Sequence, residues 1–246
     1  MKKVTFSILL FNFERMKKIV HSVLIVLALM LMLSCESSEE KSRKREVQLM
    51  STQTLGLAYL EEMKLEDAES EFKKFIELAP EDKLGYANLG LVYLRMGDYE
   101  KAQTFLSQAK EIDNEDPEIS LLLSTAYRLQ GQNGEAIRVL EEALQVNPQN
   151  PKLLFELCEL YAAQEVAESP KKRQAYLERL VGQTPGNLVP MILLTESYIK
   201  EGASDKALTE MEKIPAQFPE FPAESLPYFD QATDLLQSGK TNEALI

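Results

Sequence analysis

The residues that could do chemistry are few and widely spaced in this chain. Its 246 residues include two cysteines, Cys35 and Cys158, and one histidine, His21. Structural zinc sites use about four cysteine or histidine ligands, and a hydrolytic triad needs a histidine beside its nucleophile. Catalysis would therefore rest on the carboxylates alone, and carboxylates in repeated helical patterns usually form solvated faces. The sequence predicts no enzyme activity, no metal site and no cofactor.

The N-terminal segment that holds His21 and ends at Cys35 predicts export from the cytoplasm. Met16-Lys-Lys is followed by the uninterrupted apolar run Val23–Leu33, and a serine then precedes Cys35. A basic start, a short apolar stretch and a small residue before the cleavage point are typical of a secretory signal peptide. We therefore expect His21 to leave with the signal. An uncleaved N-terminal anchor, or an ordinary signal with an incidental cysteine, is the alternative.

The end of this segment resembles a known processing motif. Leu31-Met-Leu-Ser-Cys35 is similar to the lipobox of bacterial lipoproteins, with Met32 in place of the usual leucine. The resemblance implies a signal peptide over residues 1–34 and a lipid such as palmitate on Cys35. It also implies a place in the bacterial cell envelope, on the periplasmic or surface face of the outer membrane. Because Met16 itself opens a well-formed signal, residues 1–15 are interpreted as an upstream extension from a mis-called start.

The residues that follow Cys35 are polar and charged. Residues 35–47 lack large apolar side chains until Val47, which predicts a disordered lipid tether. The run Ser37-Ser-Glu-Glu40 resembles the acidic export tags of surface lipoproteins from Bacteroidetes, although a plain solubilising spacer explains it equally well. The whole chain has a formal net charge of −12, and removal of the basic signal makes it more negative. Such a surface repels nucleic acid and anionic lipid headgroups, so membrane attachment would come from the lipid.

A repeat of about 34 residues organises the rest of the chain. Apolar and small residues recur in each unit at helical spacing, a glycine or polar turn follows, and a second helical pattern begins. Two short amphipathic helices cannot bury their apolar faces alone, so each unit needs its neighbours. The equivalent positions of three successive units are Leu55, Gly56, Tyr59, Ala68 and Phe72; Leu89, Gly90, Tyr93, Ala102 and Leu106; and Leu123, Ser124, Tyr127, Ala136 and Leu140.

These residues and their period resemble the tetratricopeptide repeat, a helix-turn-helix unit. The resemblance implies an all-α fold, a right-handed α-solenoid of antiparallel helix pairs, with five repeats over residues 48–214. Four prolines predict a connector at 215–227, and residues 228–246 predict an incomplete sixth repeat. The turn of the fourth repeat is stretched over Ala162–Arg173. Cys158 falls at the small-residue position, so we interpret it as a buried packing residue rather than a reactive thiol.

The same resemblance implies a concave groove lined by the first helix of every repeat. Its repeat positions are mostly apolar here, which indicates a protein or peptide partner, an apolar helix or extended segment. Burial of these positions by adjacent first helices or by the tether is the alternative. The chaperone-type carboxylate clamp is absent, although Arg95 and Arg128 could hold a single carboxylate if they are not solvated or paired. The candidate groove residues are Leu57, Leu60, Leu84, Leu91, Leu94, Arg95, Leu121, Arg128, Phe155 and Ile192.

Two functional hypotheses follow from these expectations. The first is a lipid-anchored interaction scaffold or adaptor in an envelope complex, similar in architecture to pilotins and to outer-membrane assembly lipoproteins. The second takes the chain as the N-terminal repeat region of a larger secreted lipoprotein, whose ligand-binding or catalytic domain would lie beyond Ile246. The connector and the restarted repeat resemble the beginning of lipoproteins that carry an ASPIC/UnbV-type propeller.

Overall fold

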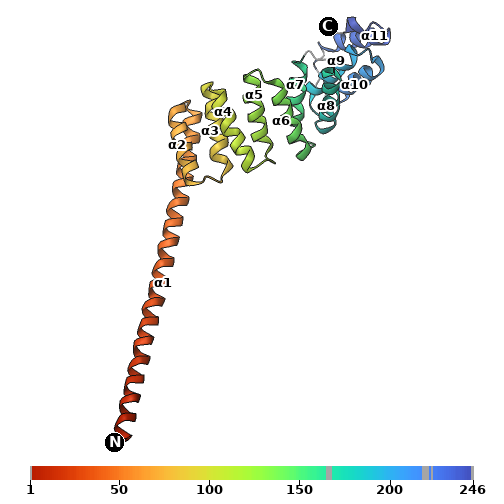
Figure 1. Cartoon of the computed structure of the whole chain (residues 1–246). Helices are drawn as coiled ribbons and strands as arrows, with labels where there is room; N and C mark the ends of the chain where they lie inside the picture. The colour runs from red at the N-terminus through yellow and green to blue at the C-terminus, as the bar shows by residue number, and fades with distance from the viewer. Residues whose placement is uncertain (1, 165–167, 218–221, 223, 245–246) are drawn as a thin grey trace.

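The fold is all-α, as the repeat pattern predicts. The computed structural model describes residues 2–164, 168–217, 222 and 224–244; within them, side chains are described from Met16 onward except at 18–19, 28–38, 216 and 241–242. Each regular element of these residues is helical (Figure 1). In chain order the helices are α1 (Lys2–Glu61), α2 (Leu65–Leu78), α3 (Lys83–Met96), α4 (Tyr99–Ile112), α5 (Pro117–Leu129), α6 (Asn133–Val146), α7 (Pro151–Ala162), α8 (Ser169–Gln183), α9 (Leu188–Lys200), α10 (Ser204–Gln217), α11 (Leu226–Gln237) and the short 3₁₀ helix η1 (Thr241–Ala244).

Four of the first helices begin at local capping signals. An aspartate or asparagine side chain accepts a hydrogen bond from a backbone N–H in the first turn of α3, α5, α7 and α9. The residues are Asp82, Asp116, Asn150 and Asn187. Gly97 ends α3 with φ 79°, a left-handed conformation that costs a glycine little. These short-range signals set the turns, so that each second helix folds back beside the first.

The helix pairs stack side by side, and each helix packs mainly on its neighbours in the chain (Figure 1). The first helices also touch across repeats, α1 with α3, α3 with α5 and α5 with α7. The first helices therefore share one face of the solenoid. The core runs between the stacked helices and includes the fully buried Phe72, Leu89, Leu106 and Leu140.

The small residue at Gly90 is required by the packing of α3 on α4. A Cβ on Gly90 would lie 2.5 Å from Cγ of Leu106 and 2.8 Å from its Cδ2, and Leu106 is fully buried. We expect Gly90→Ala to lower the free energy of unfolding by about 1–3 kcal/mol because the core becomes overpacked. Gly182→Ala in α8 is the matched control, because its Cβ meets nothing within 4 Å. That variant should gain about 0.4–1 kcal/mol. Equal effects in urea denaturation would contradict the assignment.

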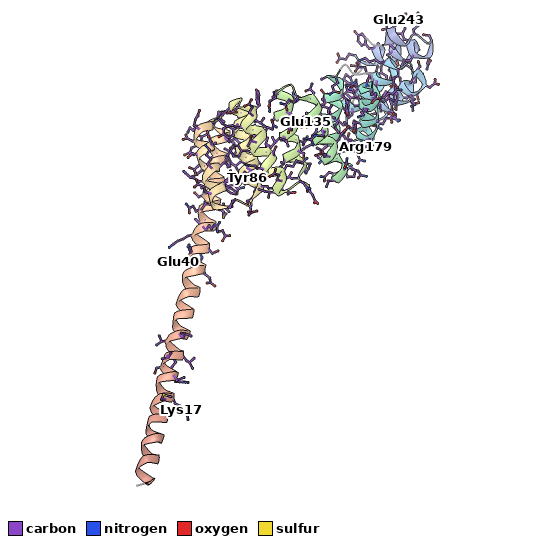
Figure 2. All side chains as sticks on the ribbon, in the orientation of Figure 1. Lys17, Glu40, Tyr86, Glu135, Arg179 and Glu243 are labelled. Atoms are coloured by element: carbon purple, nitrogen blue, oxygen red, sulfur yellow. The ribbon has the colours of Figure 1, made fainter. Side chains whose placement is uncertain are left out.

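Helix α1 extends far beyond the stacked pairs. Its C-terminal turns pack on α2, and the rest projects away from the solenoid, with Lys17 and Glu40 on the projecting part (Figure 2). The backbone of 36–47 is helical here, in contrast to the disordered tether predicted from composition. Three features favour the helix: good helix formers, an i,i+4 ion pair between Glu40 and Lys44, and a docked continuation that removes the cost of nucleation. Arg45 Nε also donates to the carbonyl oxygen of Leu78, 3.0 Å away.

Two turns are shorter than the sequence predicts. Helix α8 begins at Ser169, so part of the stretched turn expected over Ala162–Arg173 is helical, with Pro170 in the first turn where its missing N–H costs nothing. Helix α10 continues through Pro215 to Gln217, into the segment expected to be a connector. Residues 165–167, 218–221 and 223 of these two segments lie outside the described residues.

Candidate protein-binding surface

Apolar side chains are exposed along the first helices. Leu57 on α1 and Leu84 on α3 are each 39% exposed, Phe155 on α7 is 37% exposed and Ile192 on α9 is 50% exposed. Leu91 on α3 is half-buried. We name these five residues the inner strip. Leaving large apolar side chains in water forgoes about 1.5–3 kcal/mol each relative to full burial, so such a row is typical of an interaction surface.

Three of the candidate groove leucines contribute mainly to the core. Leu60 and Leu94 are half-buried and pack against the cluster around Phe72 and Leu89. Leu121 is half-buried against the cluster around Leu154. Sequence spacing places all three at groove positions, but it cannot tell how far a neighbouring repeat covers them. Leu129 on α5 and Val189 on α9 are also apolar and are 43% and 54% exposed.

The charged side chains on this face divide into paired and unpaired groups. Lys152 on α7 bonds Glu118 on α5, and Lys200 on α9 lies 2.6 Å from a carboxylate oxygen of Glu196. Arg95 and Arg128 are exposed in the last turns of α3 and α5. Neither guanidinium has a hydrogen-bond or ion-pair partner among the described residues. Their role in holding a carboxylate stays a prediction.

A series of tyrosine bonds that the sequence does not reveal holds the first helices in place. Tyr93 donates to Glu69 of the preceding helix at 2.7 Å, and Tyr161 and Tyr198 donate to Glu141 and Glu178 at 2.8 Å each. Hydrogen bonds from Lys73 and then Tyr93 hold the pKa of Glu69 below its ordinary value. The tyrosine and glutamate are 24 residues apart in the first of these pairs and 20 apart in the other two, so the 34-residue period alone does not predict the pairs.

The two cysteines differ in what the structure describes. Cys158 is fully buried in α7 against Leu177 and Leu194, which confirms the packing role expected from its repeat position. Burial raises the pKa of its thiol to about 12. The side chain of Cys35, the predicted lipidation site, lies outside the described side chains.

Two kinds of feature are absent from the described part of the chain. Within it, no group of three or more His, Cys, Asp or Glu side chains is arranged to hold a metal ion. Over the same residues, no helix combines the length and the apolar character needed to cross a membrane.

Comparison with known proteins supports the same fold. The tetratricopeptide repeat family model matches residues 84–149. No curated protein gives a significant match to the sequence. A crystal structure of a MamA protein is similar with a TM-score of 0.59 at 18% identity, over 70% of this chain and 93% of that one. MamA from Desulfovibrio magneticus RS-1 gives 0.57 at 15% identity, over 72% of this chain and 98% of that one.

A third similar structure is that of YrrB, a tetratricopeptide protein with an unusual peptide-binding site. It has a TM-score of 0.53 at 19% identity, over 68% of this chain and 85% of its own. At these identities the similarity concerns the fold alone. The chain thus has the α-solenoid fold of these structures, and its residues 84–149 match the tetratricopeptide repeat family.

Proposed function

We propose that this chain is a protein-interaction scaffold, an adaptor that holds a segment of another protein along the inner strip. The exposed apolar side chains on the first helices α1, α3, α7 and α9 carry this proposal, because the fold leaves them partly in water instead of burying them in the core. The partner segment is an apolar helix or an extended strand, which can cover such a strip continuously. The peptide-binding site of YrrB, a protein of similar fold, supports the same use of the fold here.

The unpaired arginines add a polar element to this surface. Arg95 and Arg128 lie one repeat apart beside the apolar side chains of α3 and α5. Each guanidinium can bind a carboxylate through two parallel hydrogen bonds. The partner segment would therefore carry an acidic side chain, or its C-terminal carboxylate, next to apolar residues. The acidic charge of the whole chain argues against nucleic acid as the partner.

The scaffold proposal is tested by a double substitution on the inner strip. Leu91→Asp with Phe155→Asp places two charges at positions that a partner would dehydrate. We expect the paired variant to lose at least about tenfold in affinity for proteins captured by the wild-type chain, a change of about 1.4 kcal/mol. Val146→Asp on α6 is the matched control, because Val146 is 49% exposed on a second helix. Unchanged capture by a double variant with wild-type helicity would refute the strip as the binding surface.

The envelope location is a separate proposal. A basic and apolar N-terminal segment that ends at Cys35 supports export, cleavage and lipid attachment there, and the projecting α1 would then separate the lipid from the solenoid. We expect the wild-type protein to sediment with membranes and Cys35→Ser to appear in the soluble or unprocessed fraction. Intact mass gives the direct measurement. A mature protein that retains residues 1–34, or lacks lipid on Cys35, would contradict the proposal.

A further inference from the structure

One face of helix α1 is open to water, although the same face is buried in the next three repeats. Ser51, Leu55 and Ala58 lie along it at three- and four-residue spacing, and we name these three residues the end face. Leu55 is 43% exposed, and Ser51 and Ala58 are exposed as well. The residues at the equivalent positions of α3, α5 and α7 are all buried. They are Gly85, Leu89 and Val92; Ile119, Leu123 and Ala126; and Leu153, Leu157 and Leu160.

In those later repeats the second helix of the preceding repeat covers this face. Helix α2 packs on α3, α4 on α5 and α6 on α7. At Gly85 on α3, an added Cβ would lie 2.8 Å from Cδ1 of Phe75 and 2.8 Å from Cγ1 of Ile76, and both of these residues belong to α2. Helix α1 stands at the end of the stacked pairs, where its own packing partners are α2 and α3 (Figure 1). The end face therefore has the residue types of a helix-packing surface but remains exposed.

The side chains of the end face suit a second copy of the same helix. Ser51 and Ala58 are small, so another helix can approach closely, and Leu55 projects between them. A two-fold axis between Ser51 and Leu55 would run two α1 helices antiparallel. Leu55 of each copy would then lie against Ser51 of the other. Such a surface is self-complementary, as a two-fold interface requires.

Charges at the two ends of this face also match in the antiparallel arrangement. Lys44 and Glu62 are about five helical turns apart, so they lie on the same side of the helix as Leu55. Glu62 follows the last residue of α1, and its N–H still bonds the carbonyl oxygen of Ala58 at 3.0 Å. Lys44 and Glu62 are equally far from the proposed axis, so Lys44 of one copy would face Glu62 of the other. Parallel copies would instead bring like charges together.

The existing partners of these two residues do not remove their charges from the surface. Lys44 pairs with Glu40, and Glu62 pairs with Lys64, but all four side chains are more than half exposed. Exposed pairs of this kind contribute little and exchange readily. The segment 41–64 has five basic and three acidic residues, whereas the whole chain has a net charge of −12. The general repulsion between acidic copies is therefore weakest at α1.

We propose that two copies of this chain pair through the end faces of their α1 helices, in an antiparallel dimer with Lys44 of each copy against Glu62 of the other. The dimer does not depend on the scaffold function. Leu57 of the inner strip lies on nearly the opposite side of α1 from Leu55, because two helical residues differ by about 200° in direction. Pairing of the end faces thus leaves the inner strip open in both copies.

Charge exchange on the full chain tests the pairing and its orientation. Lys44→Glu or Glu62→Lys alone puts like charges together across the dimer, and the double variant restores an opposite pair. We expect sedimentation equilibrium in mild detergent at low salt to show a wild-type dimer, dimerisation weaker by about threefold or more in each single variant, and recovery in the double variant. Effects within one copy cannot produce this recovery, because the double variant keeps like charges beside Glu40 and beside Lys64. A monomeric wild type, or a double variant as weak as the single ones, would overturn the proposal.

A matched pair of leucine variants tests the apolar contact. Leu55→Asp puts a charge in the centre of the end face, and Leu129→Asp on α5 is its control because both leucines are 43% exposed. We expect Leu55→Asp to weaken dimerisation at least about tenfold and Leu129→Asp to change it little, with wild-type helicity in both. If Leu129→Asp weakens the dimer as much as Leu55→Asp does, or if neither weakens it, the copies do not pair through α1 and the proposal fails.

Discussion

Alkylation of Cys158 by iodoacetamide at pH 8 is expected to be at least about a hundredfold slower in the folded protein than in urea. Burial raises the pKa of the thiol from its ordinary 9.0 to about 12, which lowers the population of the reactive thiolate. The side chain is also fully buried, and its sulfur lies 3.8 Å from the carbonyl oxygen of Arg173. Peptide-resolved mass spectrometry follows Cys158 separately from Cys35.

The same pKa shift fixes the sign of a pH dependence. Because folding raises the pKa of the Cys158 thiol, its contribution to the free energy of unfolding is fully present below about pH 9. That contribution decreases as the pH rises toward 12, since the unfolded chain then releases the proton more readily. A Cys158→Ala variant should accordingly lose less stability than the wild type over this interval. Equal alkylation rates for folded and unfolded protein would contradict the buried position.

Replacing Phe72 by alanine is expected to lower the free energy of unfolding by about 3–5 kcal/mol. Phe72 on α2 is fully buried, and its ring lies against Gly56, where an added Cβ would meet the ring Cζ at 2.8 Å. The residue therefore joins α2 to the docked part of α1. Because each repeat contacts only its neighbours, amide protons of α1 and α2 should lose protection first.

Phe155→Ala is the matched control for this substitution. Phe155 is 37% exposed on α7, so its truncation should cost under about 1 kcal/mol. Urea denaturation and hydrogen exchange measure both variants. A similar loss in the two proteins would mean that Phe155 belongs to the core, and the inner strip would then lose its central residue.

The repeat pattern predicts the helix pairs well because its information is local. Capping residues such as Asp82 and Asn150 lie next to the helices they begin, and Gly90 marks a close approach within one unit. Exposure of the groove positions is harder to predict. Leu57 and Leu91 occupy equivalent positions in successive repeats, yet Leu57 is exposed and Leu91 is half-buried. That difference depends on how successive repeats rotate, which no single repeat encodes.

Other features depend on contacts between distant segments. The bond from Tyr161 to Glu141 joins two repeats at a spacing that differs from the Tyr93 to Glu69 bond. Helix α11 packs on α10 and on η1 after a connector whose prolines predict a break but no direction. Composition alone also misses the helical backbone of 36–47, which the docked end of α1 helps to nucleate.

Site-specific photocrosslinking tests the central claim, that the partner binds the inner strip, most directly. A benzophenone side chain at position 155 on α7 is compared with one at position 146 on α6, since Phe155 and Val146 are similarly exposed apolar residues on first and second helices. We expect a discrete adduct from position 155 that Leu91→Asp abolishes, and none from position 146. Adducts of equal yield from both positions, or an adduct from position 146 alone, would contradict the assignment of the inner strip as the binding surface.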